Sequence, residues 1–459
     1  MFFEQVYDKS LAQASYVIGC QAGGVAAVID PKRDVDTYLE IAKNNNLKIT
    51  HILETHIHAD FLCGSRELAA LTGAELYLSD MGDKDWKYEF PHNKLRHGDH
   101  VKLGNLNFEV LHTPGHTPES ISFLLTDKPA SQEPVMLFTG DFVFVGDVGR
   151  PDLLEQAAGL KGTQEIGAAQ MFDSLNQFQK LQDFIQVWPG HGAGSACGKS
   201  LGAVPLSTVG YEKIRNWALQ LLDDRANFQK ELLADQPEPP RYFAMMKKLN
   251  KIDRELFTEV PQIQNLSRES FQNAKSEGLK IIDVRTPEAF SGGFLEGSLN
   301  IPNTNNFSTW MGWYMDYEEY FVLIAEEAEV TDLTRKLMRI GLDNIKGFIT
   351  PGQLADFEGG NLAKYSPIDK KEVKEKLKKG NVQVIDVRGA SEFKQGHIDG
   401  AENIFVGKLD QHLDQVSKEK EVIIHCQSGG RAAIAYSLLR AEGFRNVVNY
   451  AGGWEDWSN

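Results

Sequence analysis

Histidine and aspartate gather in four short stretches in the first half of the sequence. These stretches are THIHAD with His56, His58 and Asp60, HTPGHTPES with His116, LFTGDFVF with Asp141 and VWPGHGAGSACGK with His191. Imidazole and carboxylate groups are side chains that bind divalent first-row metal ions. One such stretch would mean little, because a lone histidine is more often a hydrogen-bonded structural residue. Four of them in this order predict a metal site.

A second stretch with its own chemistry, HCQSGGRAA, lies close to the C-terminus. Cys426 follows a hydrophobic strand pattern there and precedes a predicted helix. Backbone amides of the turn and the helix N-terminus surround the sulfur with positive potential, which stabilises an anionic sulfur. Arg431 adds a guanidinium that can hold an anionic substrate. The wall of the turn consists of Gln427, Ser428, Gly429 and Gly430.

Alternating strand and helix patterns position the metal-binding stretches. SYVIGCQAGGVAAVID predicts two short strands, DVDTYLEIAKNNNL has apolar residues at helical spacing, and KITHILETHIHAD predicts a strand that ends in the first metal-binding turn. The alternation continues to about residue 200 and predicts an α/β sandwich. A helical region follows, and ADQPEPPR (234–241) predicts a rigid, exposed break.

The second half of the sequence contains a repeat. LKIIDVRTPEAFSGGFLEGSLNIP (279–302) is echoed by VQVIDVRGASEFKQGHIDGAENI (382–404), and each copy continues into a second hydrophobic strand pattern. Two α/β domains are therefore predicted. Ala325 stands opposite Cys426, and the acidic run EEAEV replaces the amide-rich turn and its arginine. We expect the first copy to be a spacer or docking surface with no chemistry of its own.

Composition narrows the function classes. The chain has 459 residues, 42% hydrophobic and 24% charged, and a formal net charge of −16. The two fractions predict a soluble globular protein, and the charge predicts a surface that repels nucleic acid and anionic membranes. Neither a secretory signal nor an apolar run of the roughly 18 residues needed to cross a membrane is visible. The four cysteines are scattered and form no C-x-x-C pair, so we expect a reducing cytoplasm.

Residues 1–240 resemble the metallo-β-lactamase superfamily in all four metal-binding stretches. Two-metal members of that family carry T-H-x-H-x-D-H, and the last histidine helps to hold the second metal. This chain has Phe61 at that position, and a phenyl ring cannot coordinate a metal. The second site would retain Asp60, His191 and Asp141, so we expect one metal per chain.

Within this superfamily, the combination H-x-H-A-D, T-P-G-H-T and T-G-D resembles the one-metal persulfide dioxygenases, and GDVGRPD (146–152) is similar to their G-x-G-R-x-D stretch. Familiar members often keep the histidine that Phe61 replaces, but it is not an iron ligand there. The resemblance implies one Fe(II) per chain, held by His56, His116 and Asp141. The remaining polar residues of the metal-binding stretches would orient ligands or bind water; they are His58, Asp60 and His191.

The two repeated domains resemble rhodaneses, the sulfurtransferase fold. Cys426 to Arg431 is a six-residue loop, as in sulfur-handling rhodaneses, whereas phosphatase relatives use a longer one. The predicted architecture is a metallo-β-lactamase αββα sandwich (1–240), a degenerate rhodanese-like domain (262–358) and an active rhodanese domain (366–459).

Three further residues are candidates near the metal. Gly-rich flanks suggest that Cys197 lies on an exposed loop, where Lys199 could stabilise its thiolate, although an ordinary small apolar role has equal weight. Arg150 and Lys199 are candidates to bind the acidic part of a thiol carrier.

The two resemblances together imply a persulfide dioxygenase fused to a rhodanese. A low-molecular-weight persulfide and O2 would give sulfite, and Cys426 would transfer sulfane sulfur to sulfite, making thiosulfate and detoxifying sulfide. The resemblance also implies a homo-oligomer. Two alternatives remain: a thioester hydrolase like glyoxalase II, and a non-enzymatic sulfur carrier or sensor.

Overall fold

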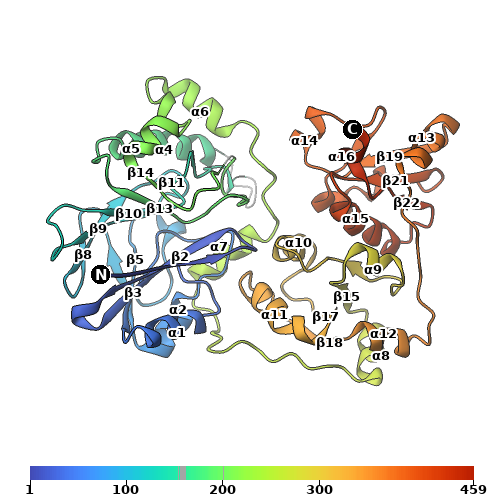
Figure 1. The fold of residues 1–459 in the computed structure, drawn as a ribbon, viewed down its shortest axis with the longest axis horizontal. Helices are drawn as coiled ribbons and strands as arrows, with labels where there is room; N and C mark the ends of the chain where they lie inside the picture. Colours follow the sequence, from blue (N-terminus) through green and yellow to red (C-terminus); the bar gives the residue numbers. More distant parts are fainter. Residues whose placement is uncertain (154, 156–161, 200) are drawn as a thin grey trace. The chain divides into compact units, whose positions relative to one another are not determined.

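The computed structural model describes residues 1–153, 155, 162–199 and 201–459 (Figure 1). Its chain divides into two units, of which the first comprises residues 1–261 with 338–341 and the second comprises residues 262–337 with 342–459. Among the described helices, none has both the length and the apolar character that a membrane crossing requires.

Two six-stranded sheets pack face to face in the first unit. One has the order β1-β2-β3-β4-β5-β6 and the other the order β14-β13-β10-β9-β8-β7. The strands of the first sheet are β1 (Phe2–Asp8), β2 (Gln13–Cys20), β3 (Val25–Ile29), β4 (Lys48–Leu53), β5 (Glu75–Ser79) and β6 (Asn93–Leu95). Those of the second are β7 (His100–Leu103), β8 (Leu106–His112), β9 (Ile121–Asp127), β10 (Met136–Gly140), β13 (Gln186–Pro189) and β14 (Ser207–Thr208).

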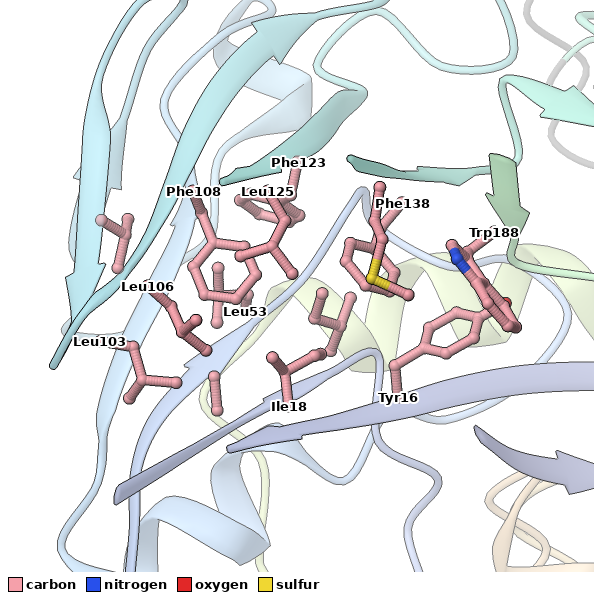
Figure 2. Packing of buried hydrophobic residues seen from close by; sticks show 14 of the residues in the cluster. Tyr16, Ile18, Leu53, Leu103, Leu106, Phe108, Phe123, Leu125, Phe138 and Trp188 are labelled. Atoms are coloured by element: carbon pink, nitrogen blue, oxygen red, sulfur yellow. The ribbon is translucent and has the colours of Figure 1, made fainter. Parts of the chain in front are cut away.

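Side chains along these strands alternate between the inner face of each sheet and its outer face. Tyr16 and Ile18 of β2 meet Phe138 of β10 in the core between the sheets, as Figure 2 shows. Val17 and Leu137, each next to one of those residues in sequence, point outward into separate clusters. Because side chains of a strand alternate between its two faces, each buried strand contributes to both layers.

Helices cover the outer face of each sheet. Helices α1 (Asp36–Asn44) and α2 (Ser65–Thr72) pack on the first sheet, and α4 (Thr163–Phe178) and α6 (Arg225–Leu233) pack on the second, near α5 (Val209–Arg215). This arrangement confirms the predicted sandwich. Residues 234–241 form no helix or strand, and the first unit continues beyond them through α7 (Phe243–Lys251).

The second unit contains two parallel four-stranded sheets of the same topology, with orders β16-β15-β17-β18 and β20-β19-β21-β22. The first has strands β15 (Lys280–Asp283), β16 (Leu299–Asn300), β17 (Phe321–Ile324) and β18 (Ile345–Ile349), with helices α8 (Arg268–Ser276), α9 (Pro287–Ser291), α10 (Phe307–Tyr314), α11 (Val330–Met338) and α12 (Pro351–Phe357). The second has strands β19 (Val382–Asp386), β20 (Glu402–Asn403), β21 (Glu421–His425) and β22 (Val447–Asn449), with helices α13 (Lys370–Lys379), α14 (Ala390–Gln395), α15 (Gly430–Ala441) and α16 (Gly453–Ser458). The sequence repeat therefore corresponds to two domains of the same fold.

Candidate metal centre and sulfur-transfer loop

Three metal-binding groups meet where strands of the two facing sheets end. His56 follows β4, His116 lies in the loop after β8, and Asp141 comes directly after β10. One ligand atom from each lies within 4.8 Å of the others. The Nε2 atom of His116 is 3.5 Å from Oδ2 of Asp141, and that of His56 is 4.0 Å from the same oxygen. The sequence thus brings two imidazoles and one carboxylate together in a buried site.

The opposite nitrogen of each imidazole fixes its orientation. Nδ1 of His56 lies 3.0 Å from the Thr55 hydroxyl, and Nδ1 of His116 lies 2.9 Å from the carbonyl oxygen of Arg150. Burial lowers the pKa of both histidines, which keeps the rings neutral. Among the described residues, His56 Nε2 and both carboxylate oxygens of Asp141 are buried without a hydrogen-bond partner. Buried polar atoms rarely stay unsatisfied, so this donor set fits a metal ion.

His58 lies beside this trio but faces another residue. Its Nε2 atom is 3.1 Å from Oδ1 of Asp30. Burial alone lowers the pKa of His58, but the Asp30 carboxylate outweighs it and raises the pKa to about 9. The buried ring of Phe61 packs against His58, with centroids 4.4 Å apart. These contacts support an orienting role for His58, which remains a prediction.

A second group of possible ligands consists of Asp60, His191 and Cys197. The Nε2 atom of His191 is 3.1 Å from Oδ2 of Asp60, and its Nδ1 is 3.2 Å from the carbonyl oxygen of Ala12. The expected exposure of Cys197 is wrong, because only 1% of it is accessible. Burial, together with Asp60 and Asp141, raises the pKa of its thiol well above the usual value. The second group therefore has three possible ligands despite Phe61, because the Cys197 sulfur lies beside Asp60 and His191.

The two predicted substrate-binding cations already have partners. Arg150 is fully buried, and its guanidinium donates to both carboxylate oxygens of Asp152 at 2.8 and 2.6 Å. The ammonium of Lys199 donates to the carbonyl oxygen of Glu231 and lies 5.4 Å from the ring centroid of Trp217. These contacts give both residues a structural role, and their part in substrate binding stays a prediction.

Three residues that support the THIHAD turn were not predicted from the sequence. Oε1 of Glu119 accepts a hydrogen bond from the Ile57 amide at 2.8 Å, and Asp30 holds His58. Asn250 donates to the carbonyl oxygens of His58 and Phe61, both at 2.8 Å. Asp30 could have been suspected as a carboxylate at the end of a hydrophobic strand. Asn250, on α7, carries no such signal.

The predicted sulfur-carrying loop connects β21 to α15. Cys426 is 1% exposed, and its Sγ accepts a hydrogen bond from the Gly429 amide at 3.1 Å. Gly429 has a φ of +95°, which favours glycine. The amide of Trp454 donates to the Cys426 carbonyl at 2.8 Å and so fixes the loop from the following α16. The geometry holds the sulfur at a helix N-terminus, as predicted.

Arg431 has a partner that was not predicted. Its guanidinium donates to both carboxylate oxygens of Glu392, at 2.6 and 2.8 Å. The pair is partly exposed, with 22% of the Arg431 side chain and 37% of the Glu392 side chain accessible. An incoming oxyanion therefore meets a guanidinium whose charge is already balanced by a carboxylate.

The corresponding turn of the first copy carries neither a thiol nor an arginine. Ala325 follows β17 directly, as Cys426 follows β21, and both strands are third in their sheet order. This confirms the predicted alignment of the two residues. The Glu326 amide donates to the Glu329 carboxylate at 3.4 Å, so an acidic side chain satisfies the turn.

Family profiles match both parts of the chain. A Metallo-beta-lactamase superfamily profile matches residues 10–191, and a Rhodanese-like domain profile matches residues 267–348 and 369–459. The crystal structure of a metallo-beta-lactamase from Staphylococcus aureus is 47% identical, covers 76% of this chain and 99% of its own, and superposes with a TM-score of 0.72.

Two further comparisons cover smaller parts of the chain. Hydroxyacylglutathione hydrolase from Rhodospirillum rubrum is 34% identical over 178 residues, which are 38% of this chain and 60% of that protein. The chain thus spans about three fifths of that relative's length. The crystal structure of ETHE1 from Myxococcus xanthus is 30% identical, covers 52% of this chain and 93% of its own, and has a TM-score of 0.43.

Proposed function

This chain belongs to the metallo-β-lactamase superfamily and carries rhodanese-like domains after its metallo-β-lactamase domain; from that premise we propose that it oxidises a low-molecular-weight thiol persulfide and transfers sulfane sulfur. The observation that carries the proposal is the buried two-histidine, one-carboxylate set in a chain that also holds the Cys426 loop. The overall oxidation is R–S–S⁻ + O2 + H2O giving R–SH, SO3²⁻ and H⁺.

His56, His116 and Asp141 would hold one Fe(II). When bound, a ferrous ion with open coordination positions supplies the O2 activation that this oxidation requires. Thr55 and the Arg150 carbonyl keep the two imidazoles aimed at the site. The Asp141 carboxylate supplies the negative charge that a divalent ion needs in a buried place.

Cys426, which lies in the second unit, would carry out the second reaction. Its persulfide donates the outer sulfur to sulfite, so that Cys–S–S⁻ and SO3²⁻ give Cys–S⁻ and S2O3²⁻. The S–S bond of the persulfide breaks and a new S–S bond forms in thiosulfate. The Gly429 amide, which already donates to Sγ, can stabilise the thiolate that leaves.

A thioester hydrolase is the second candidate. The hydroxyacylglutathione hydrolase relative favours it, and so does the Asp60, His191 and Cys197 group, which offers donors for a second metal ion. Hydrolases of two metals use both ions to hold and activate water. Metal content and oxygen uptake separate the two candidates.

The test measures iron, zinc and oxygen uptake in the intact protein with glutathione persulfide as substrate. We expect close to one iron per chain and O2 consumption, which His116→Ala should reduce at least about a hundredfold because a ligand is lost. His100→Ala is the matched control, since His100 is an exposed histidine of the same unit. Two zinc ions per chain, with thioester hydrolysis and no oxygen uptake, would overturn the proposal.

A further inference from the structure

A cavity of about 440 Å³ opens over Cys426, and its lining comes from both rhodanese-like copies. The second copy contributes the sulfur loop, including Cys426 and Arg431. The first copy contributes Thr304, Asn306 and Trp310, from the segment that leads into α10. The copy predicted to be only a spacer or docking surface therefore forms one wall of the sulfur-transfer site.

Ring contacts and hydrogen bonds fix this wall to the second copy. The ring centroids of Trp310 and Trp313 lie 6.3 and 5.4 Å from the ring centroid of Phe405. The Tyr314 hydroxyl donates to the Val406 carbonyl oxygen. The Asn300 amide donates to the hydroxyl of Ser437 on α15 at 2.9 Å. Contacts on both sides of the segment thus hold it in register with the loop.

The size of the cavity exceeds what an inorganic sulfur donor needs. Pockets of about 300–1,000 Å³ are typical for organic ligands, and a water molecule takes only about 30 Å³. Sulfite and thiosulfate have a few heavy atoms each, so they would leave most of 440 Å³ unfilled. The volume suits a molecule with a carbon chain behind its reacting sulfur.

The chemistry of the lining points the same way. Its charged side chain, Arg431, already binds Glu392, and the other polar side chains that line it are neutral. Asn306 and Thr304 can hydrogen-bond to amide groups, and Trp310 offers an aromatic face for a flat or apolar segment. An amide-containing thiol matches this combination better than a small, multiply charged oxyanion does.

We propose that this cavity binds the organic part of an amide-containing persulfide, R–S–SH, and that Trp310, Asn306 and Thr304 are positioning residues for sulfur transfer to Cys426. This rests on the proposed sulfur-transfer function. The Cys426 thiolate attacks the outer sulfur of R–S–SH, and a new S–S bond forms as the old one breaks. The electron pair leaves with R–S⁻, and the proton stays on the transferred sulfur, so no further oxidant or reductant is needed.

The experiment measures how fast Cys426 gains one sulfur atom, by peptide mass spectrometry of the full-length protein mixed anaerobically with a donor. Glutathione persulfide is the organic donor and thiosulfate is the inorganic one. For Trp310→Ala we expect the ratio of the two rate constants, organic over inorganic, to fall roughly tenfold, the size of effect that one lost pocket contact commonly has. For Asn306→Ala, an exposed position, the ratio should fall about two- to tenfold, in proportion to one neutral hydrogen bond.

Asn305→Ala is the matched control, because Asn305 is exposed in the same segment but does not line the cavity. A fall in the rates with both donors by the same factor, or no change in the ratio in either variant, would overturn the inference. The assay needs neither O2 nor the metal centre. A failed dioxygenase test therefore leaves it intact, whereas a native protein whose Cys426 gains no sulfur from either donor would show that the sulfur-transfer proposal itself is wrong.

Discussion

The two rhodanese-like copies keep the same internal hydrogen bonds although only one of them carries a thiol. In the first copy, Arg285 donates to Asp283, and the Asn300 amide group donates to the carbonyl oxygens of Asp283 and Arg285 at 3.0 and 2.9 Å. In the second, Arg388 donates to Asp386, and Asn403 makes the two equivalent bonds, both at 2.9 Å. The repeated I-D-V-R and asparagine thus maintain the fold.

The copies differ where the third strand of each sheet ends. When the two copies are aligned along the repeat, Arg431 corresponds to Val330 and Glu392 corresponds to Ala289. The ion pair of the second copy is therefore replaced by two small apolar residues in the first, together with the change from Cys426 to Ala325. The comparison teaches that residues shared by both copies build the sheet, while the residues to which we assign sulfur transfer occur in one copy.

The largest expected effect is the loss of sulfur transfer in Cys426→Ser. A hydroxyl cannot hold sulfane sulfur, so transfer should fall to background while oxygen uptake continues. With excess persulfide and O2, the native chain should release mainly thiosulfate, because joining both sites raises the local sulfite concentration. The variant should release sulfite instead, and Ala325→Ser should behave as the native protein does. The measurement is the ratio of sulfite to thiosulfate, and an unchanged ratio in Cys426→Ser would contradict the comparison.

A smaller effect is expected when the ion pair of the second copy is broken. Glu392→Gln removes the carboxylate that balances Arg431, so the guanidinium becomes available to a bound oxyanion. The KM for thiosulfate should fall about two- to fivefold, in line with the small energy of a partly exposed pair. Steady-state kinetics with thiosulfate and cyanide measure this, and Glu288→Gln in the first copy is the control. A raised KM would mean that Glu392 orients Arg431 rather than restraining it.

Much of this architecture could be predicted because it follows from local patterns. Hydrophobic alternation placed the strands, and the metal-binding stretches follow β4, β8, β10 and β13. Sequence spacing likewise placed Ala325 opposite Cys426. Both predictions depend on which residues follow a strand, and sequence order carries that information directly.

What sequence could not supply are contacts between distant segments. Asn250 reaches the THIHAD turn from far along the chain, and Thr304 and Trp310 of one copy line the cavity of the other. The burial of Cys197 was also missed, because glycine-rich flanks resemble those of an exposed loop. The ion pair between Glu392 and Arg431 joins α14 to α15 within one domain. Each of these depends on how elements pack, which no local pattern records.

The smallest effect should come from a thiol placed in the first copy. Ala325→Cys, made in the Cys426→Ser chain, restores a sulfur at the equivalent strand end but neither the glycine-rich turn nor a cation. The Glu326 amide remains bound to Glu329, and Val330 stands where the arginine would be needed. Without amide donors a buried thiol resists ionisation, so sulfur transfer should remain at the background of the Cys426→Ser parent. The assay is thiosulfate:cyanide transfer, with thermal unfolding as a check on the fold. Recovery of even a tenth of native transfer would show that position alone, rather than the surrounding turn, distinguishes the two copies.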